Sequence, residues 1–195
     1  ATNGNIGSSS KFLNISSADT LNMYAKENIY FSGNNGDLNI NELVSNNGSI
    51  SIIVPNGSAF INHISAPEKV EVIANGEEIN IETVDPKELF IQVNNENGQI
   101  NINEGFVSQK ATLIADNITA NLVDNNFNNP LSLTITGNDS NMSNNVTLSI
   151  RTALMNSDIF NADYSVINLT SNLLDMRMVN VGKEMDIYTP KREIF

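Results

Sequence analysis

Acidic side chains recur at one position of a repeated phrase, and they are the groups of this chain best suited to chemistry. Glu42, Glu104 and His63 each lie six residues after the glycine that opens their phrase. Glu82 also lies six residues after a glycine, but alignment of the isoleucines moves it one place, onto the neighbouring position. If the phrases stack on one another, these side chains form a column.

Such a column, with Asp37 and Glu77 near it, could cleave sugars or bind a cation. Glycosidases place two carboxylates across the bond that they cleave. Like charges stacked at the strand spacing of about 4.8 Å repel each other and need compensation. Basic partners and sugar-stacking aromatics are few, since the chain has no Trp and its arginines are Arg151, Arg177 and Arg192. A solvated edge is therefore the favoured interpretation, with a cation-binding strip as the alternative.

His63 is the only histidine, and the chain has no cysteine. A zinc site draws its ligands mainly from these two residue types and carboxylates. No Gly-x-Ser-x-Gly elbow marks a serine nucleophile. We therefore interpret His63 as a solvated or turn-adjacent side chain, and the sequence predicts no catalytic residue, metal ligand or cofactor.

Two Asn-rich and Asp-rich loops, at 124–129 and 137–145, carry oxygen atoms that calcium could use. Their spacing matches neither the EF-hand nor the Gly-Gly-x-Gly-x-Asp nonapeptide, so polar loops without a metal are the favoured interpretation. Binding groups tend to lie on loops held by a rigid scaffold. The predicted ligand-facing residues are Asp124, Asn125, Asn126, Asn138, Asp139 and Asn141.

A repeat of about 20 residues must position these groups. Its phrases open at Gly36, Gly57, Gly76 and Gly98, with spacings of 21, 19 and 22 residues. A second strand-like phrase follows in each unit, as in Ser49-Ile-Ser-Ile-Ile-Val. Asn-Gly tolerates positive φ and suits tight turns. Each unit therefore predicts two short β segments and two turns.

Apolar residues alternate within the phrases, which indicates one buried face and one wet face of Asn, Ser, Glu and Thr. Hairpins at the Asn-Gly turns would give an antiparallel sandwich. We favour a parallel β-solenoid, because the phrase recurs in the same order at the period of one coil. A column of Leu38, Ala59, Ile79 and Ile100 on parallel strands would distinguish the two folds.

The sequence predicts a single domain over residues 1–195, with regular coils at about 20–120 and looser coils with loop insertions at 121–195. The later strands are expected in the segments 131–136, 146–151, 164–169, 176–181 and 185–188. The segment 18–27 fits either a helix capped by Asp19 or another strand.

Composition excludes several classes of protein. The net charge of −12 and the pI near 4.3 argue against nucleic-acid binding through a basic surface. The absence of cysteine excludes disulfide scaffolds, and no apolar run is long enough for a membrane span. The start Ala-Thr-Asn-Gly-Asn has no signal-peptide features and no initiator Met, so we expect a piece of a longer polypeptide or a mature form.

The phrase Gly-x-Leu/Ile-x-Ile-Asn, repeated about every 20 residues, resembles the β-helical shafts of filamentous-haemagglutinin-type adhesins. The second half, with Leu131-Ser-Leu-Thr-Ile-Thr-Gly-Asn-Asp-Ser-Asn-Met-Ser-Asn-Asn, is similar to leukotoxin-like filamentous adhesins of Gram-negative bacteria. The resemblance covers residues 20–190. It implies a right-handed parallel β-helix, export by two-partner secretion or as an autotransporter passenger, and a role in adhesion, with no catalytic residues.

Two functions follow from these observations. The first is an adhesive segment of a secreted bacterial surface protein, whose partner is a glycan or protein on a host or bacterial cell. The second is a carbohydrate-active β-helix enzyme, such as a lyase or a tailspike-like depolymerase. The acids are scattered and the bases few, which favours adhesion.

Overall fold

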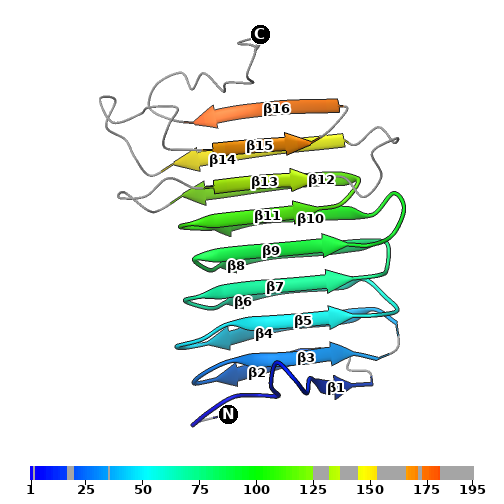
Figure 1. Ribbon diagram of the computed structural model, residues 1–195, viewed down its shortest axis with the longest axis vertical. Helices are drawn as coiled ribbons and strands as arrows, with labels where there is room; N and C mark the ends of the chain where they lie inside the picture. The colour runs from blue at the N-terminus through cyan, green and yellow to red at the C-terminus, as the bar shows by residue number, and fades with distance from the viewer. Residues whose placement is uncertain are drawn as a thin grey trace.

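The computed structural model describes residues 1, 3–16, 20–34 and 36–124, and beyond them the backbone of four strands. The chain forms two parallel sheets of eight strands each (Figure 1). It passes from one sheet to the other after each strand, so that each coil of about 20 residues adds one strand to each sheet. The described part contains no helix, and the fold is a parallel β-solenoid.

The first sheet holds the odd-numbered strands in chain order. Its strands are β1 (Leu13–Ile15), β3 (Ile29–Gly33), β5 (Ile50–Val54), β7 (Lys69–Ala74), β9 (Glu88–Val93), β11 (Lys110–Ile114), β13 (Ser132–Thr136) and β15 (Val166–Thr170). The second sheet holds β2 (Leu21–Ala25), β4 (Leu38–Ser45), β6 (Ala59–Ser65), β8 (Glu78–Asp85), β10 (Gln99–Phe106), β12 (Asn117–Asp124), β14 (Asn145–Thr152) and β16 (Leu173–Asn180).

The core lies inside the coils and is built from columns of aliphatic side chains. Leu38 pairs with Ala59, Ala59 with Ile79, and Ile79 with Ile100, all on parallel strands. These four side chains are buried. The column confirms the solenoid and excludes the antiparallel sandwich.

The strands β4, β6, β8 and β10 share a departure from strict alternation. Each places two successive residues on its outer side, such as Asn41 and Glu42 in β4, before the next residue, Leu43, returns to the core. β12 lacks the extra residue, so its register with β10 shifts between Ile102 and Gly105. The four strands share the doubled outward residue and pair with one another without a register shift, so a bulge arises only where a neighbouring strand lacks it, as between β10 and β12.

Glycine is required at the turns for two different reasons, a positive φ or a close approach of two backbones. Gly36 has a φ of 80°, which favours glycine. Gly57 and Gly76 have no positive φ, and they are glycines because successive coils approach closely there. A Cβ on Gly57 would lie 2.2 Å from the carbonyl oxygen of Gly36. The interpretation of Asn-Gly as a positive-φ turn therefore holds for Gly36 and is wrong for Gly57 and Gly76.

The sequence leaves a helix or a strand open for the segment 18–27 and predicts further strands after residue 130. Leu21–Ala25 forms β2, so this part of the segment 18–27 is a strand and not a helix. β13, β14, β15 and β16 overlap the expected later strands, whereas the segment 185–188 lies outside the described residues. No helix in the described residues could cross a membrane.

Candidate binding groove

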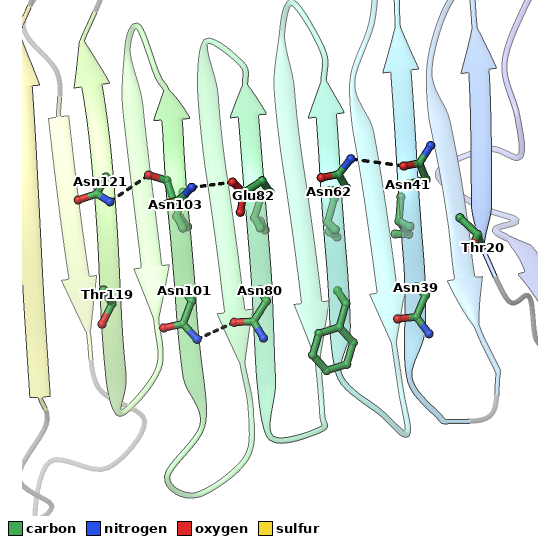
Figure 2. A pocket seen from close by; sticks show the side chains of 15 residues that line it. Thr20, Asn39, Asn41, Asn62, Asn80, Glu82, Asn101, Asn103, Thr119 and Asn121 are labelled. Atoms are coloured by element: carbon green, nitrogen blue, oxygen red, sulfur yellow. Dashed lines mark hydrogen bonds between the residues drawn. The ribbon is translucent and has the colours of Figure 1, made fainter.

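A shallow groove of about 630 Å³ crosses the outer face of the second sheet (Figure 2). It runs across the strands from β4 to β12, parallel to the direction in which coils stack. Fourteen of its lining residues come from β4, β6, β8, β10 and β12, and most of them are polar. The full lining is Thr20, Asn39, Ile40, Asn41, Phe60, Ile61, Asn62, Asn80, Ile81, Glu82, Asn101, Ile102, Asn103, Thr119 and Asn121.

Two columns of outward side chains flank the groove, because alternate residues of each strand point outward. The isoleucines between them point into the core and are buried. We call the two columns the 39-column and the 41-column. The 39-column contains Asn39, Phe60, Asn80, Asn101 and Thr119. The 41-column contains Asn41, Asn62, Glu82, Asn103 and Asn121.

Side-chain amides within the columns are hydrogen-bonded from one coil to the previous one (Figure 2). Asn62 Nδ2 donates to Asn41 Oδ1 at 3.3 Å, and Asn103 Nδ2 donates to Glu82 Oε1 at 2.7 Å. Asn101 Nδ2 donates to Asn80 Oδ1 at 2.5 Å. These bonds hold the amides in a fixed orientation along the groove.

The hydrogen bonds between coils leave donors and acceptors unused on each asparagine amide. An asparagine side chain carries two N–H donors and an oxygen with two lone pairs. A bond to each neighbouring coil uses one donor and one lone pair. A fixed amide therefore keeps one donor and one acceptor for a ligand or water.

The predicted column of acidic residues is present beside the groove. Glu42 pairs with His63, His63 with Thr83, and Thr83 with Glu104, each on the next strand of the sheet. Glu82 lies in the 41-column, as alignment of the isoleucines predicted. His63 and Thr83 separate the two carboxylates of the column, and this separation reduces the repulsion that direct stacking would cause.

The other acids expected near the column lie at turns and do not join it. Asp37 precedes β4, and its Oδ1 accepts a hydrogen bond from the backbone N–H of Ser58 at 2.9 Å. Glu77 precedes β8, and its backbone N–H donates to the Ser58 hydroxyl at 3.1 Å. In the part of the chain that the structure describes, no group of three His, Asp or Glu side chains could hold a metal ion.

The first coil contributes one further contact to the acidic column. The hydroxyl of Tyr24 donates a hydrogen bond to a carboxylate oxygen of Glu42. This bond, followed by desolvation and by the nearby negative charge, raises the pKa of Tyr24 above its usual value. The tyrosine is therefore a hydrogen-bond donor to the carboxylate at neutral pH, not a base.

A charge cluster on the first sheet was not expected from the sequence. Lys69 Nζ lies 2.8 Å from Glu71 Oε1, and the Ser51 hydroxyl donates to the other oxygen of Glu71 at 2.8 Å. Lys69 also lies 5.5 Å from the ring centroid of Phe90. Burial acts to raise the pKa of Glu71, but the hydrogen bonds from Lys69 and Ser51 and the Lys69 charge together lower it below its usual value.

The first predicted ligand-facing loop begins at the end of β12. Asp124 is the last residue of β12. The remaining predicted residues, Asn125, Asn126, Asn138, Asp139 and Asn141, lie outside the described residues. The sequence argument misses the groove, because it assigns the Asn residues to a wet face without a binding role. The signal that could have revealed it is the pair of outward positions flanking one isoleucine, as in Asn39-Ile-Asn41 and Asn101-Ile-Asn103.

Comparison with known proteins adds no relative from which a function could be carried over. The chain matches no family model, no curated protein and no solved structure at a significant level.

Proposed function

We propose that this chain is a structural and adhesive segment of a large secreted bacterial surface protein of the filamentous-haemagglutinin type. The observation that carries the proposal is the unbroken parallel stack of coils, in which each strand of a sheet pairs with the strand that the next coil adds to that sheet. A stack of this kind grows in one direction and suits a shaft that holds binding surfaces away from a cell.

The surface of the solenoid supports the adhesive part of the proposal. A rigid scaffold reduces the entropy lost when its side chains bind a partner. The second sheet presents a polar groove with oriented amides, and the charge of −12 keeps a strand-rich body soluble. Both features suit a surface that meets other molecules in water.

The distribution of acids favours binding over sugar cleavage. Most glycosidases need two carboxylates that flank the scissile bond. Among the residues lining the groove, Glu82 alone carries a carboxylate, and no lining residue is Lys or Arg. Glu42 and Glu104 lie in the adjacent column with two strands between them.

Binding to cells and turnover of polysaccharides test the proposal together. Fluorescently labelled protein is incubated with epithelial cells and with bacterial cells, and saturable binding is measured by flow cytometry. In parallel, the protein is incubated with a panel of polysaccharides, and new reducing ends are measured. We expect saturable binding to at least one cell type and no new reducing ends from any polysaccharide. Release of oligosaccharides would establish the enzyme instead, and absence of binding to every cell type would contradict adhesion.

A further inference from the structure

We propose that the groove between the 39-column and the 41-column binds one linear chain of uncharged sugar units, lying along the direction in which the coils stack. The inference rests on the proposed adhesive function and assigns it a ligand class. It is carried by the spacing, the hydrogen-bonding chemistry, the aromatic residue and the charge of the groove.

The spacing of the groove matches a polymer rather than a small molecule. Its polar side chains recur once per coil over five strands of the second sheet, from β4 to β12. Neighbouring strands lie about 4.8 Å apart. The pyranose units of an extended polysaccharide recur at a similar spacing, so successive units can meet equivalent side chains on successive coils.

The hydrogen-bonding groups of the groove match hydroxyl groups. A sugar hydroxyl donates one hydrogen bond and accepts others, and an asparagine amide offers both a donor and an acceptor. The bond between Asn101 and Asn80, at 2.5 Å, and that between Asn62 and Asn41, at 3.3 Å, hold the amides before a ligand arrives. Preorganised groups lose less conformational entropy on binding.

Phe60 gives the groove one apolar surface. It pairs with Asn39 on one side and with Asn80 on the other, so an aromatic ring takes the place of an amide in the 39-column. Its side chain is half-buried and lines the groove. A pyranose has a face of C–H groups, and an aromatic ring buries such a face well because it is large, flat and apolar.

Charge selects an uncharged chain over an acidic one. Glu82 lines the groove, and Glu42 and Glu104 lie in the adjacent column. No Lys or Arg is among the lining residues, and the whole chain carries a charge of −12. Sulfated chains and chains of uronic acids would meet repulsion from these carboxylates.

The test measures binding of the whole chain to oligosaccharides of defined length by titration calorimetry. The probes are β-1,4-linked glucose, mannose and N-acetylglucosamine oligomers of two to seven units, with heparin and polygalacturonate fragments as acidic probes. We expect at least one neutral series to bind, with affinity rising up to about five units, the number of coils that the groove crosses. We expect the acidic probes not to bind.

Two variants test whether the oligosaccharide binds in the groove. Phe60→Ala and Asn80→Ala should each weaken binding about tenfold, as expected when a central contact is removed. Asn94→Ala is the matched control, because Asn94 also donates to an asparagine of the previous coil, Asn75, at 2.8 Å, but lies outside the groove. The control should retain full affinity, and circular dichroism should be unchanged in all three.

The outcomes separate this inference from the proposed function. Binding to cells without binding to any neutral oligomer would overturn the inference and leave adhesion standing. Preferential binding of heparin or polygalacturonate would also overturn it, as would an equal loss of affinity in Asn94→Ala. Loss of binding to both cells and oligomers would contradict the inference and the adhesive function together.

Discussion

Gly57 and Gly76 lie where the backbones of successive coils come into direct contact. The backbone N–H of Gly76 donates to the carbonyl oxygen of Gly57 at 2.8 Å. A Cβ on Gly76 would lie 2.2 Å from the carbonyl carbon of Gly57, and its other near neighbours are also backbone atoms. Because backbone atoms of a paired coil cannot rotate aside, this contact sets the distance between turns.

We expect Gly76→Ala to lower the free energy of unfolding by about 2 kcal/mol, because relief of the clash requires the turns to separate. The measurement is chemical denaturation followed by far-ultraviolet circular dichroism. Gly4→Ala is the control, since a Cβ there would meet no atom within 4 Å and Gly4 has no positive φ. A loss in Gly4→Ala equal to that in Gly76→Ala would argue against close packing as the cause.

Glu71 should make stability depend on pH. Its pKa is lowered in the folded protein from an ordinary value of 4.5, so its charged form stabilises the fold above that value. The contribution is lost as the pH falls through the folded pKa, when the carboxylate is protonated in both states. Glu71→Gln should therefore lower the melting temperature at pH 7, and the difference from the wild type should shrink below about pH 4.

Exposure to water limits how much the Glu71 ion pair contributes to the free energy of unfolding. The side chains of Lys69 and Glu71 are 41% and 28% exposed, and partly exposed ion pairs contribute on the order of 1 kcal/mol or less. Glu96→Gln is the matched control, because Glu96 lies in an exposed turn after β9. A pH-independent difference between Glu71→Gln and the wild type would show that packing, not charge, is responsible.

At the scale of the strand, the same residue type contributes differently to the free energy of unfolding at inward and outward positions. Ile79 in β8 is fully buried in the core column, whereas Ile73 in β7 is half-buried on the outer face of the first sheet. Ile73 pairs with Ile53 and Gln92 in an outward column. The expectation of an outer face made only of polar residues is therefore wrong at Ile53 and Ile73.

We expect Ile79→Ala to cost about 3 kcal/mol of unfolding free energy, since it leaves a cavity in a closely packed core. Ile73→Ala should cost less than about 1 kcal/mol, because its side chain is already in contact with water. Chemical denaturation of the two variants measures both values. Equal losses would contradict the assignment of the two faces.

The strand pattern was predictable from the sequence, but the pair of successive outward residues in β4, β6, β8 and β10 was not. Period two and the repeated phrase placed Leu38, Ala59 and Ile79 in one column, because identical coils must stack in register. The doubled outward residue, as at Asn41 and Glu42, gives no signal in composition, since both members are polar in any arrangement. It places Glu42 and Glu104 beside the groove, whereas the groove itself lies between outward residues that alternate, as in Asn39-Ile-Asn41.

At the scale of the whole molecule, stability should vary along the stack. In a repeat fold, each unit contacts only its neighbours, so stability is a sum of unit and interface contributions. β2 pairs within its sheet with β4 alone, whereas β6 lies between β4 and β8 and is paired on both sides. A central coil therefore opens only when two interfaces are broken.

Hydrogen exchange followed by mass spectrometry tests this argument. We expect amides of β6 and β8 to exchange more slowly than those of β2, because opening at the end of a sheet breaks one interface instead of two. Ile79→Ala adds a second test, since a cavity in β8 should speed exchange in β6 and β10 more than in β2. Equal acceleration in all these strands would mean that the coils unfold as one cooperative unit, and the description of the solenoid as a sum of nearest-neighbour contacts would then be wrong.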